Sequence, residues 1–250
     1  MKQIIFFSIT CLIIVSCKLN NSKFDAQKII DKSIIASGSD KISSSTLEFD
    51  FRKYNYKAIR NNGMFSLERN FYKDSAFYRD VLSNNGFQRF INNNKVTTSQ
   101  INSKNFSESI NSVHYFSILP YGLNDKAVKK DFLGIVDIKG KNYFKIKVSF
   151  TKDGGGVDYD DVFIYWIHKE DYLIDYLAYS YKSNGGGIRF RDIKNSKIVK
   201  GVRFLNYNNY KPIRSIKLEN IDTEYLNNQL KKISEIDIEN IYCQLIINFK

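Results

Sequence analysis

Residues 157–210 read VDYDDVFIYWIHKEDYLIDYLAYSYKSNGGGIRFRDIKNSKIVKGVRFLNYNNY. Aromatic and β-branched residues dominate this stretch, and short polar or glycine-containing turns divide it, which is typical of consecutive β-strands. A strand from Val157 to His168, the turn Lys169–Tyr172 and a strand from Leu173 to Lys182 predict an antiparallel hairpin. Asn184 to Gly187 then open a third strand. The stretch therefore predicts an antiparallel sheet.

Two glycine triplets, Gly154–Gly156 and Gly185–Gly187, lie at nearly equal distances along the chain from the turn at Glu170. Antiparallel pairing brings both triplets to the same end of the sheet, where glycine permits either a tight bend or a rim that meets a ligand through backbone amides. The acidic residues at this end are Asp153, Asp158, Asp160 and Asp161. Carboxylates bind calcium, but this spacing fits no calcium loop and strand alternation divides the side chains between two faces. We therefore expect a solvated rim and no metal site.

Outside this stretch, one segment has helical spacing and most of the rest alternates. Apolar residues recur at helical spacing from Phe24 to Ala36, and Gly38 is a typical stop signal. Leu47 to Arg52 and Tyr143 to Phe150 alternate between two residue classes, which predicts strands. The turn signals between strands are Asn84–Gly86, Asn92–Lys95 and Lys139–Asn142. Asp125 to Lys130 is compatible with a short second helix.

The length of the chain indicates one domain. No linker rich in proline, glycine or serine divides residues 24–250 of this 250-residue chain, so we expect a single core. One amphipathic helix followed by alternating strands predicts a mostly β fold of the α+β type. Two of the three cysteines lie within the first 17 residues, so no intramolecular disulfide is expected. Cys243, in an apolar strand predicted from Ile241 to Phe249, is expected to be a small buried apolar residue.

The N-terminus has the features of a lipoprotein export signal. Lys2 precedes an apolar run from Ile4 to Val15, which is shorter than the ~20 residues that span a bilayer as a helix. A small residue and then Cys17 follow, and the segment resembles a bacterial lipobox, with Ile14 three residues before the cysteine. We expect residues 1–16 to be removed as a signal peptide and Cys17 to carry diacylglyceryl and acyl groups such as palmitate. A transmembrane anchor, or an ordinary signal with a chance cysteine, is the alternative.

Residues 17–23 are expected to be a lipidated tether before the domain. Two or more acyl chains are sufficient for stable attachment to a membrane. Some bacteria with two membranes place acidic residues directly after the lipidated cysteine of lipoproteins sent to the cell surface, and this tether has none. The sequence therefore favours an outer-membrane lipoprotein of the cell envelope that faces the periplasm.

The net charge of +12 is explained either by an anionic binding partner or by a bias in the amino-acid composition. The basic residues are scattered and no nucleic-acid motif occurs, so we expect no nucleic-acid partner. Anionic lipid headgroups would fit the charge. The alternative is a compositional bias, because Lys, Asn, Ile and Tyr are abundant throughout the chain.

The pattern of reactive residues favours a protein that is not an enzyme. His114 and His168 are the two histidines, and neither occurs in a metal-binding spacing such as His-Glu-x-x-His. No Gly-x-Ser-x-Gly motif is present, and nothing in the sequence indicates a cofactor. His168 lies beside Glu170 and Asp171, an arrangement that acid–base chemistry could use, but the sequence favours a surface histidine at a turn.

Aromatic residues and arginines of the opening stretch are candidate ligand contacts. The candidates are Trp166, Tyr165, Tyr176, Tyr179, Arg189 and Arg191. The aromatic side chains would either line a ligand cleft or belong to the core. Arg189 and Arg191 are two residues apart, so they share one face of a strand, where a guanidinium pair would bind a phosphate or carboxylate. The alternative is pairing with Asp175 or neighbouring acids across the sheet.

Several short motifs carry a family resemblance. They are Tyr165-Trp166-Ile167, Asp175–Tyr179, Gly187–Arg191, Gly201–Phe204, Tyr207–Tyr210, His114-Tyr115-Phe116 and Leu119–Leu123. Together they resemble a family of uncharacterised secreted bacterial lipoproteins. Asp192 to Lys197 departs from that family, in which Glu-Ala and a later arginine are expected.

The family is similar in fold to the lipoprotein-localisation factors LolA and LolB. This resemblance implies a curled antiparallel sheet that forms an unclosed half-barrel around one or a few helices, with an apolar concave face that holds acyl chains. A fold resemblance does not by itself assign a function.

Three hypotheses of function follow. The first is a membrane-anchored lipoprotein that binds a lipid or other apolar molecule in the concave face of its sheet. The second is a structural or interaction lipoprotein that docks an envelope protein or polymer. The third is a hydrolase or lyase, which requires a polar pocket around His168 or the aspartates.

Overall fold

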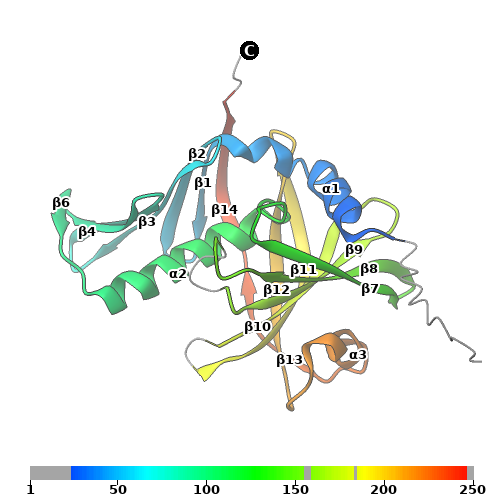
Figure 1. Cartoon of the computed structure of the whole chain (residues 1–250). Helices are drawn as coiled ribbons and strands as arrows, with labels where there is room; N and C mark the ends of the chain where they lie inside the picture. The colour runs from blue at the N-terminus through cyan, green and yellow to red at the C-terminus, as the bar shows by residue number, and fades with distance from the viewer. Residues whose placement is uncertain (1–23, 155–158, 183–184, 247–250) are drawn as a thin grey trace, which may run out of the picture.

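Two antiparallel seven-stranded sheets make up most of the chain in the computed structural model, which describes residues 24–154, 159–182 and 185–246 (Figure 1). The first sheet has the order β14-β1-β2-β3-β4-β5-β6 and comprises β1 (Ser44–Phe51), β2 (Tyr54–Asn61), β3 (Met64–Lys73), β4 (Ala76–Ser83), β5 (Gly86–Ile91), β6 (Asn94–Val96) and β14 (Ile238–Leu245). The second has the order β13-β12-β11-β10-β9-β8-β7 and comprises β7 (Val128–Ile138), β8 (Lys141–Phe150), β9 (Val162–His168), β10 (Ile174–Tyr181), β11 (Gly187–Val199), β12 (Val202–Pro212) and β13 (Leu230–Ile236).

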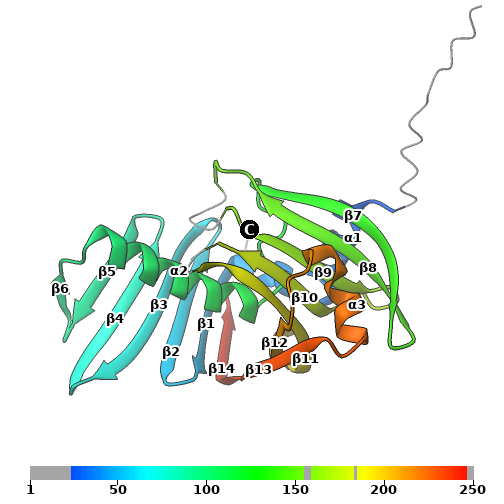
Figure 2. The same cartoon turned by 90° about the horizontal axis from the view of Figure 1, so that it is seen from below.

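One edge of the first sheet is joined directly to one edge of the second sheet. Asp237 alone separates β13, the edge of the second sheet, from β14, the edge of the first. β6 and β7 form the far edges of the two sheets. The two sheets curl around α2 (Gln100–Ser117), the helix that connects β6 to β7 (Figures 1 and 2). The prediction of a mostly antiparallel, unclosed β architecture is confirmed, with the curled surface divided into two sheets.

Three α-helices accompany the sheets in the described part of the chain. They are α1 (Ala26–Ala36), α2 (Gln100–Ser117) and α3 (Ile221–Leu226), and two 3₁₀-helices, η1 (Ser39–Ser43) and η3 (Leu218–Asn220), also occur. α1 matches the predicted helix, and the Asp25 side chain caps it by accepting a hydrogen bond from the backbone N–H of Gln27. None of these helices has the length and apolarity needed to cross a membrane.

α2 is the largest element that the sequence pattern does not predict. Its buried positions recur at helical spacing and are Ser107, Ile110, Val113, His114, Phe116 and Ser117. Half of these residues are polar, so the apolar stripe that normally identifies a helix is weak. Ser99 caps its N-terminus by accepting a hydrogen bond from the backbone N–H of Asn102 at 3.3 Å.

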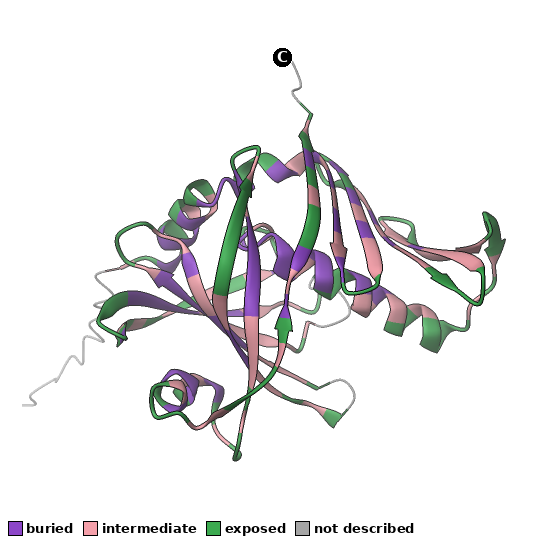
Figure 3. Ribbon diagram, turned by 180° about the vertical axis from the view of Figure 1, so that it is seen from behind, coloured by how far each residue is buried: buried purple, intermediate pink, exposed green. Residues whose placement is uncertain are grey.

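The apolar core divides between the two faces of the second sheet. The face toward α2, called the inner face below, carries the larger cluster, which also includes the first sheet, α1 and α2. The opposite face, called the outer face, carries a smaller cluster with Trp166 and Phe190, which η3 and α3 cover with Leu218 and Ile221. Four consecutive residues of β9, Ile164 to Ile167, are therefore buried, and Figure 3 colours the buried residues of the strands purple.

Several predicted boundaries are corrected by the structure. Asp125 to Lys130 is not a helix: a turn leads into β7, which begins at Val128. The strand predicted from Val157 begins at Val162, because residues 159 and 160 lie in a turn, while Val157 itself is outside the described residues. The strand predicted from Ile241 to Phe249 begins earlier, at Ile238, and ends at Leu245.

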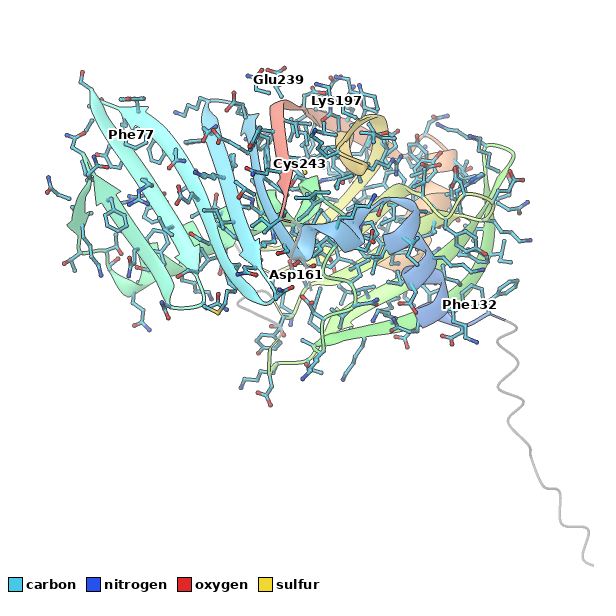
Figure 4. The ribbon with its side chains drawn as sticks, turned by 90° about the horizontal axis from the view of Figure 1, so that it is seen from above. Phe77, Phe132, Asp161, Lys197, Glu239 and Cys243 are labelled. Atoms are coloured by element: carbon cyan, nitrogen blue, oxygen red, sulfur yellow. The ribbon has the colours of Figure 1, made fainter. Side chains whose placement is uncertain are left out.

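Two further predictions concern single features of the sheets. Cys243 is buried with its thiol free, as expected, and Figure 4 shows it on β14. Ser180 pairs with Val162 on one side and with Ile188 on the other, so the loops that carry the two glycine triplets leave the second sheet at the same end. Gly155 and Gly156 lie outside the described residues.

Candidate functional site

A cleft of about 540 Å³ lies on the inner face, between α2 and both sheets. Its lining comes from the first sheet, α2, the segment that follows α2 and the second sheet. The lining residues are Arg60, Gly63, Met64, Phe65, Leu67, Asn111, Ser112, His114, Tyr115, Phe116, Ile118, Leu119, Tyr121, Gly122, Asp125, Ala127, Val128, Phe150, Gly154, Asp161, Phe163, Leu177, Tyr179 and Arg191. Figure 4 shows Asp161 near the hairpin of β2 and β3, which supplies Gly63 and Met64 to the same cleft. The cleft thus joins segments that are spread over residues 60–191 of the chain.

Three consecutive residues of α2 attach the helix to both sheets beside the cleft. His114 Nε2 lies 3.2 Å from the Glu68 carbonyl oxygen on β3. The hydroxyls of Tyr115 and Tyr165, on α2 and β9, are 2.6 Å apart and share a hydrogen bond. The Tyr207 hydroxyl on β12 donates to the Phe116 carbonyl at 2.6 Å. The His114-Tyr115-Phe116 motif therefore holds the end of α2 across the junction of the two sheets.

His114 is neutral in this position. Burial lowers its pKa to about 3, and the nearby Arg60 charge acts in the same direction. Since the Glu68 carbonyl only accepts, the neutral ring donates its Nε2 proton to that oxygen. The rings of Phe49 and Tyr56 pack edge-on against the imidazole, at centroid distances of 5.7 and 5.6 Å. A neutral, buried histidine of this kind packs against the aromatic rings and positions α2 on the sheet.

Stacked aromatic rings form one wall of the cleft. The Phe163 ring on β9 stacks on that of Tyr179 at a centroid distance of 5.4 Å, and the Tyr115 and Phe150 rings meet it edge-on at 5.5 and 5.9 Å. All four side chains line the cleft and are only partly buried. They present apolar surface to the cleft from α2 and from three strands of the second sheet.

The structure separates the predicted ligand contacts into two groups. Tyr165, Tyr179 and Arg191 lie on the inner face, where Tyr179 and Arg191 line the cleft and Tyr165 lies fully buried against Tyr115. Trp166 and Tyr176 lie on the outer face. Neighbouring residues of a strand point to opposite faces, so Tyr165 and Trp166 do not share one cleft.

Arg189 shares the inner face with Arg191 but lies beyond the cleft lining. Its guanidinium carbon is 5.1 Å from the Tyr181 ring centroid, and its Nη1 donates to the Ile188 carbonyl at 2.9 Å. Asp175, the acidic partner suggested for these arginines by the sequence, instead lies 3.6 Å from Arg203. Neither Arg189 nor Arg191 forms an ion pair within the described residues.

Trp166 belongs to a buried polar network on the outer face. Its indole Nε1 donates to Asp222 on α3 at 3.1 Å, and Lys145 on β8 donates to the same carboxylate oxygen at 2.6 Å. Lys145 and Asp222 are both more than nine-tenths buried. This network fixes α3 to the sheet and gives Trp166 a structural role.

A second hollow, of about 470 Å³, lies on the outer face beside α3 and is polar. Asp192 accepts hydrogen bonds there from the hydroxyls of Tyr225 and Tyr210, at 2.6 and 3.1 Å, and from the Asn208 amide at 2.7 Å. Burial and the Asp192 carboxylate raise the pKa of Tyr210 to about 12. Tyr176 also lines this hollow, whose carboxylates already have hydrogen-bond donors from the protein.

His168 lies at the end of β9, outside the lining of both hollows. Its Nδ1 is 3.1 Å from Asp171, and its ring packs on that of Tyr143. Asp160 forms an ion pair with Lys182 at 3.3 Å. Within the described residues no group of three or more His, Cys, Asp or Glu side chains is arranged to hold a metal ion.

Two unclosed antiparallel sheets, curled around a helix with an aromatic-walled cleft beneath it, define a β protein of the half-barrel class. The family model of DUF6503, a family of unknown function, matches residues 2–240. The chain belongs to this family. No curated protein matches the chain in sequence.

Similar solved structures include a member of the LolA superfamily. A domain described as an outer membrane lipoprotein-sorting protein, from Vibrio parahaemolyticus, is 9% identical with a TM-score of 0.47 over 90% of this chain and 95% of its own. A LolA superfamily protein from Nitrosomonas europaea is 9% identical with a TM-score of 0.46 over 87% and 93%. A DUF1329 family protein from Desulfovibrio piger is 9% identical with a TM-score of 0.41 over 89% and 95%.

Proposed function

We propose that this chain is a cell-envelope lipoprotein that binds one lipid or other apolar molecule in the inner cleft. The observation that carries the proposal is the cleft itself, with a volume of about 540 Å³ and a wall of stacked aromatic rings. Sites for small molecules are typically concave, ~300–1,000 Å³ in volume, and lined mainly by apolar side chains with a few polar groups. The inner cleft has each of these properties.

The partly exposed apolar lining gives a driving force for binding. Phe65, Phe150, Phe163 and Val128 are only partly buried although they pack against the core. An apolar chain placed against them would remove apolar surface from water, which contributes roughly 25 cal/mol for each Å² buried. The outer hollow lacks such a lining, since carboxylates, lysines and tyrosine hydroxyls surround it. We therefore assign the ligand to the inner cleft.

We expect a tryptophan at Ser112 to weaken binding of a fluorescent fatty acid at least tenfold, which equals about 1.4 kcal/mol. Ser112 is exposed on α2 and lines the cleft, so a large ring there occupies ligand space without entering the core. Asn105→Trp is the matched control, because Asn105 is exposed on the same helix away from the cleft. Titration of the soluble domain, purified without its signal and with Cys17 replaced, measures both affinities.

Native mass spectrometry with lipid extraction tests the proposal on the protein purified from its own envelope. We expect an apolar molecule bound at one per chain. A domain that is purified without a bound molecule and also binds no fluorescent fatty acid would overturn the proposal. This result would favour the docking of an envelope protein or polymer instead.

The anchoring part of the proposal rests on Cys17, which lies outside the described residues together with the rest of residues 1–23. Metabolic labelling with a palmitate analogue should mark the native chain and should fail completely for Cys17→Ala, because the replacement removes the thiol that accepts the diacylglyceryl group. The Cys243→Ala variant is the control and should retain the label, since Cys243 is buried in β14. Label on the Cys17→Ala chain would show that the cysteine is not the lipidated residue.

A further inference from the structure

Two arginines that line the inner cleft are buried without an acidic partner. Arg60, on β2, is 6% exposed, and Arg191, on β11, is 8% exposed. Neither guanidinium forms an ion pair with a carboxylate within the described residues. Asp125 also lines the cleft, and it forms no ion pair with either arginine within the described residues.

The Arg60 guanidinium has few contacts of its own. Alternation along β2 places Arg60 on the same face as Tyr56 and Ala58, toward α2. Its guanidinium carbon is 5.3 Å from the centroid of the Tyr121 ring, and its Nη1 is buried without a hydrogen-bond partner. Burial lowers the pKa of Arg60 to about 10, which still leaves it charged at neutral pH.

Arg191 is enclosed by aromatic rings. Its guanidinium carbon lies 4.8 Å from the Phe116 ring centroid, 5.1 Å from that of Tyr179 and 5.7 Å from that of Tyr207. Its Nη2 donates to the Tyr179 hydroxyl at 3.0 Å, while its Nε is buried without a partner. The rings stabilise the cation partly, and one donor remains unused.

Other deeply buried cations of this chain have carboxylate partners. Arg69 contacts Asp80 at 2.7 Å, and Lys145 contacts Asp222 at 2.6 Å. A buried charge without a partner is costly, because it loses its hydration and gains no compensating charge. In the described part of the chain the two exceptions are Arg60 and Arg191, and both lie at the cleft, where an incoming molecule could supply that charge.

We propose that the ligand of the inner cleft is an anionic amphiphile, whose carboxylate or phosphate accepts hydrogen bonds from Arg60 and Arg191 while its apolar chain lies on the aromatic wall. This inference rests on the proposed function and adds the charge of the ligand to it. Guanidinium groups are well suited to this role, since their N–H donors match the geometry of carboxylate and phosphate oxygens.

Matched amphiphiles test the inference without any mutation. Dodecanoate and dodecanol have the same chain length and differ in charge, so calorimetric titration of the native soluble domain with each isolates the contribution of the anionic group. We expect dodecanoate to bind at least tenfold more tightly. Equal affinities would overturn the inference and leave the proposed function intact, whereas binding of neither would overturn the proposed function itself.

Substitution of both arginines by glutamine tests their role. The Arg60→Gln/Arg191→Gln variant should bind the two amphiphiles equally, with the dodecanol affinity retained. Arg60→Lys/Arg191→Lys, which keeps the charges, should preserve most of the preference, and Arg79→Gln, which removes one positive charge outside the cleft, should leave the preference unchanged. A preference that persists in the double glutamine variant would overturn the inference.

Free anions distinguish the source of the anionic group. Acetate and inorganic phosphate should bind far more weakly than dodecanoate, because they lack the chain that contacts the aromatic wall. The opposite result is that inorganic phosphate binds as tightly as dodecanoate and loses that binding in the double glutamine variant. This result would identify a site for free anions and would overturn the inference that the ligand is an amphiphile.

Discussion

Replacing Asp80 by alanine is expected to lower the free energy of unfolding by about 3–5 kcal/mol, because two arginines lose the carboxylate that they share. Asp80 on β4 is fully buried and accepts hydrogen bonds from both. Its Oδ2 lies 2.7 Å from Arg69 Nη2, and its Oδ1 lies 2.6 Å from Arg89 Nε. Alanine would leave the two guanidinium groups in the interior without a counter-charge, which costs more than the loss of ordinary packing.

This network also holds the middle of α2, at Phe106 and Ser109, on the first sheet. Arg69 Nη1 donates to the Ser109 hydroxyl at 2.9 Å, and the Arg89 guanidinium carbon lies 3.9 Å from the centroid of the Phe106 ring. Loss of Asp80 should therefore increase amide hydrogen exchange around Phe106 and Ser109 more than at the C-terminal end of α2, which the His114-Tyr115-Phe116 motif ties separately to both sheets.

Chemical denaturation measures the predicted loss. Asp80→Asn, which keeps the size of the side chain and part of the hydrogen bonding, should lose less stability than Asp80→Ala. Glu170→Ala, at an exposed turn, is the control and should stay within about 0.5 kcal/mol of the native chain. A loss below about 1 kcal/mol for Asp80→Ala would contradict a central role for this carboxylate.

The second large effect is a loss of stability at acidic pH that depends on His114. Burial lowers the pKa of this histidine to about 3 in the folded chain, from an ordinary value of 6.5. Between these two values the unfolded chain binds a proton that the folded chain does not, so stability rises with pH in this window and falls as the pH drops below about 6.5. The slope from one such group reaches about 1.4 kcal/mol per pH unit, so we expect a loss of roughly 2–3 kcal/mol between pH 6.5 and 4.5.

The pH dependence is separated from the cost of the mutation by comparing slopes. His114→Gln removes the titrating group and keeps a neutral side chain that donates a hydrogen bond. Its free energy of unfolding, measured by denaturation across the same pH range, should therefore change less with pH than that of the native chain, whatever its absolute value. Parallel curves for the two chains would show that His114 titrates normally and is accessible to water.

The strands and their turns could be predicted from the sequence because their signals are local. Alternation from Tyr143 to Phe150 and the turn at Lys139–Asn142 depend on residues adjacent in the chain, and β7 and β8 pair across that turn. α1 was predictable for the same reason, since its buried residues Ile29 and Ile30 form an apolar stripe. These signals need no knowledge of what packs against the element.

α2 could not be predicted because its stability depends on distant partners. Its buried face contains Ser107 and Ser117 as well as His114, and these polar residues are tolerated because the sheets supply hydrogen bonds and aromatic contacts. Its middle, at Phe106 and Ser109, contacts the Arg69–Asp80–Arg89 network rather than an apolar core. No pattern within residues 100–117 reveals that environment.

Two residues of the cleft lining, Tyr179 and Arg191, are among the contacts predicted from the sequence, but the sequence does not distinguish the two faces of the sheet, for a physical reason. All four central residues of β9, Ile164 to Ile167, are buried, so the inner and outer faces look equally apolar in sequence. Alternation alone separates Tyr165 from Trp166, but it does not show that α3 covers one face while the other borders a cleft. Arg60 was missed because a lone arginine in an alternating strand gives no signal of burial.

The sequence by itself determined the predominance of antiparallel strands, the first helix and the burial of Cys243, because propensity, periodicity and turn chemistry act over a few residues. Only the tertiary structure decided where α2 lies, which aromatic residues face the cleft and which buried cations have carboxylate partners. These features depend on contacts between residues far apart in the chain. Their energies come from burial and charge compensation, which exist only after the two sheets and α2 have come together.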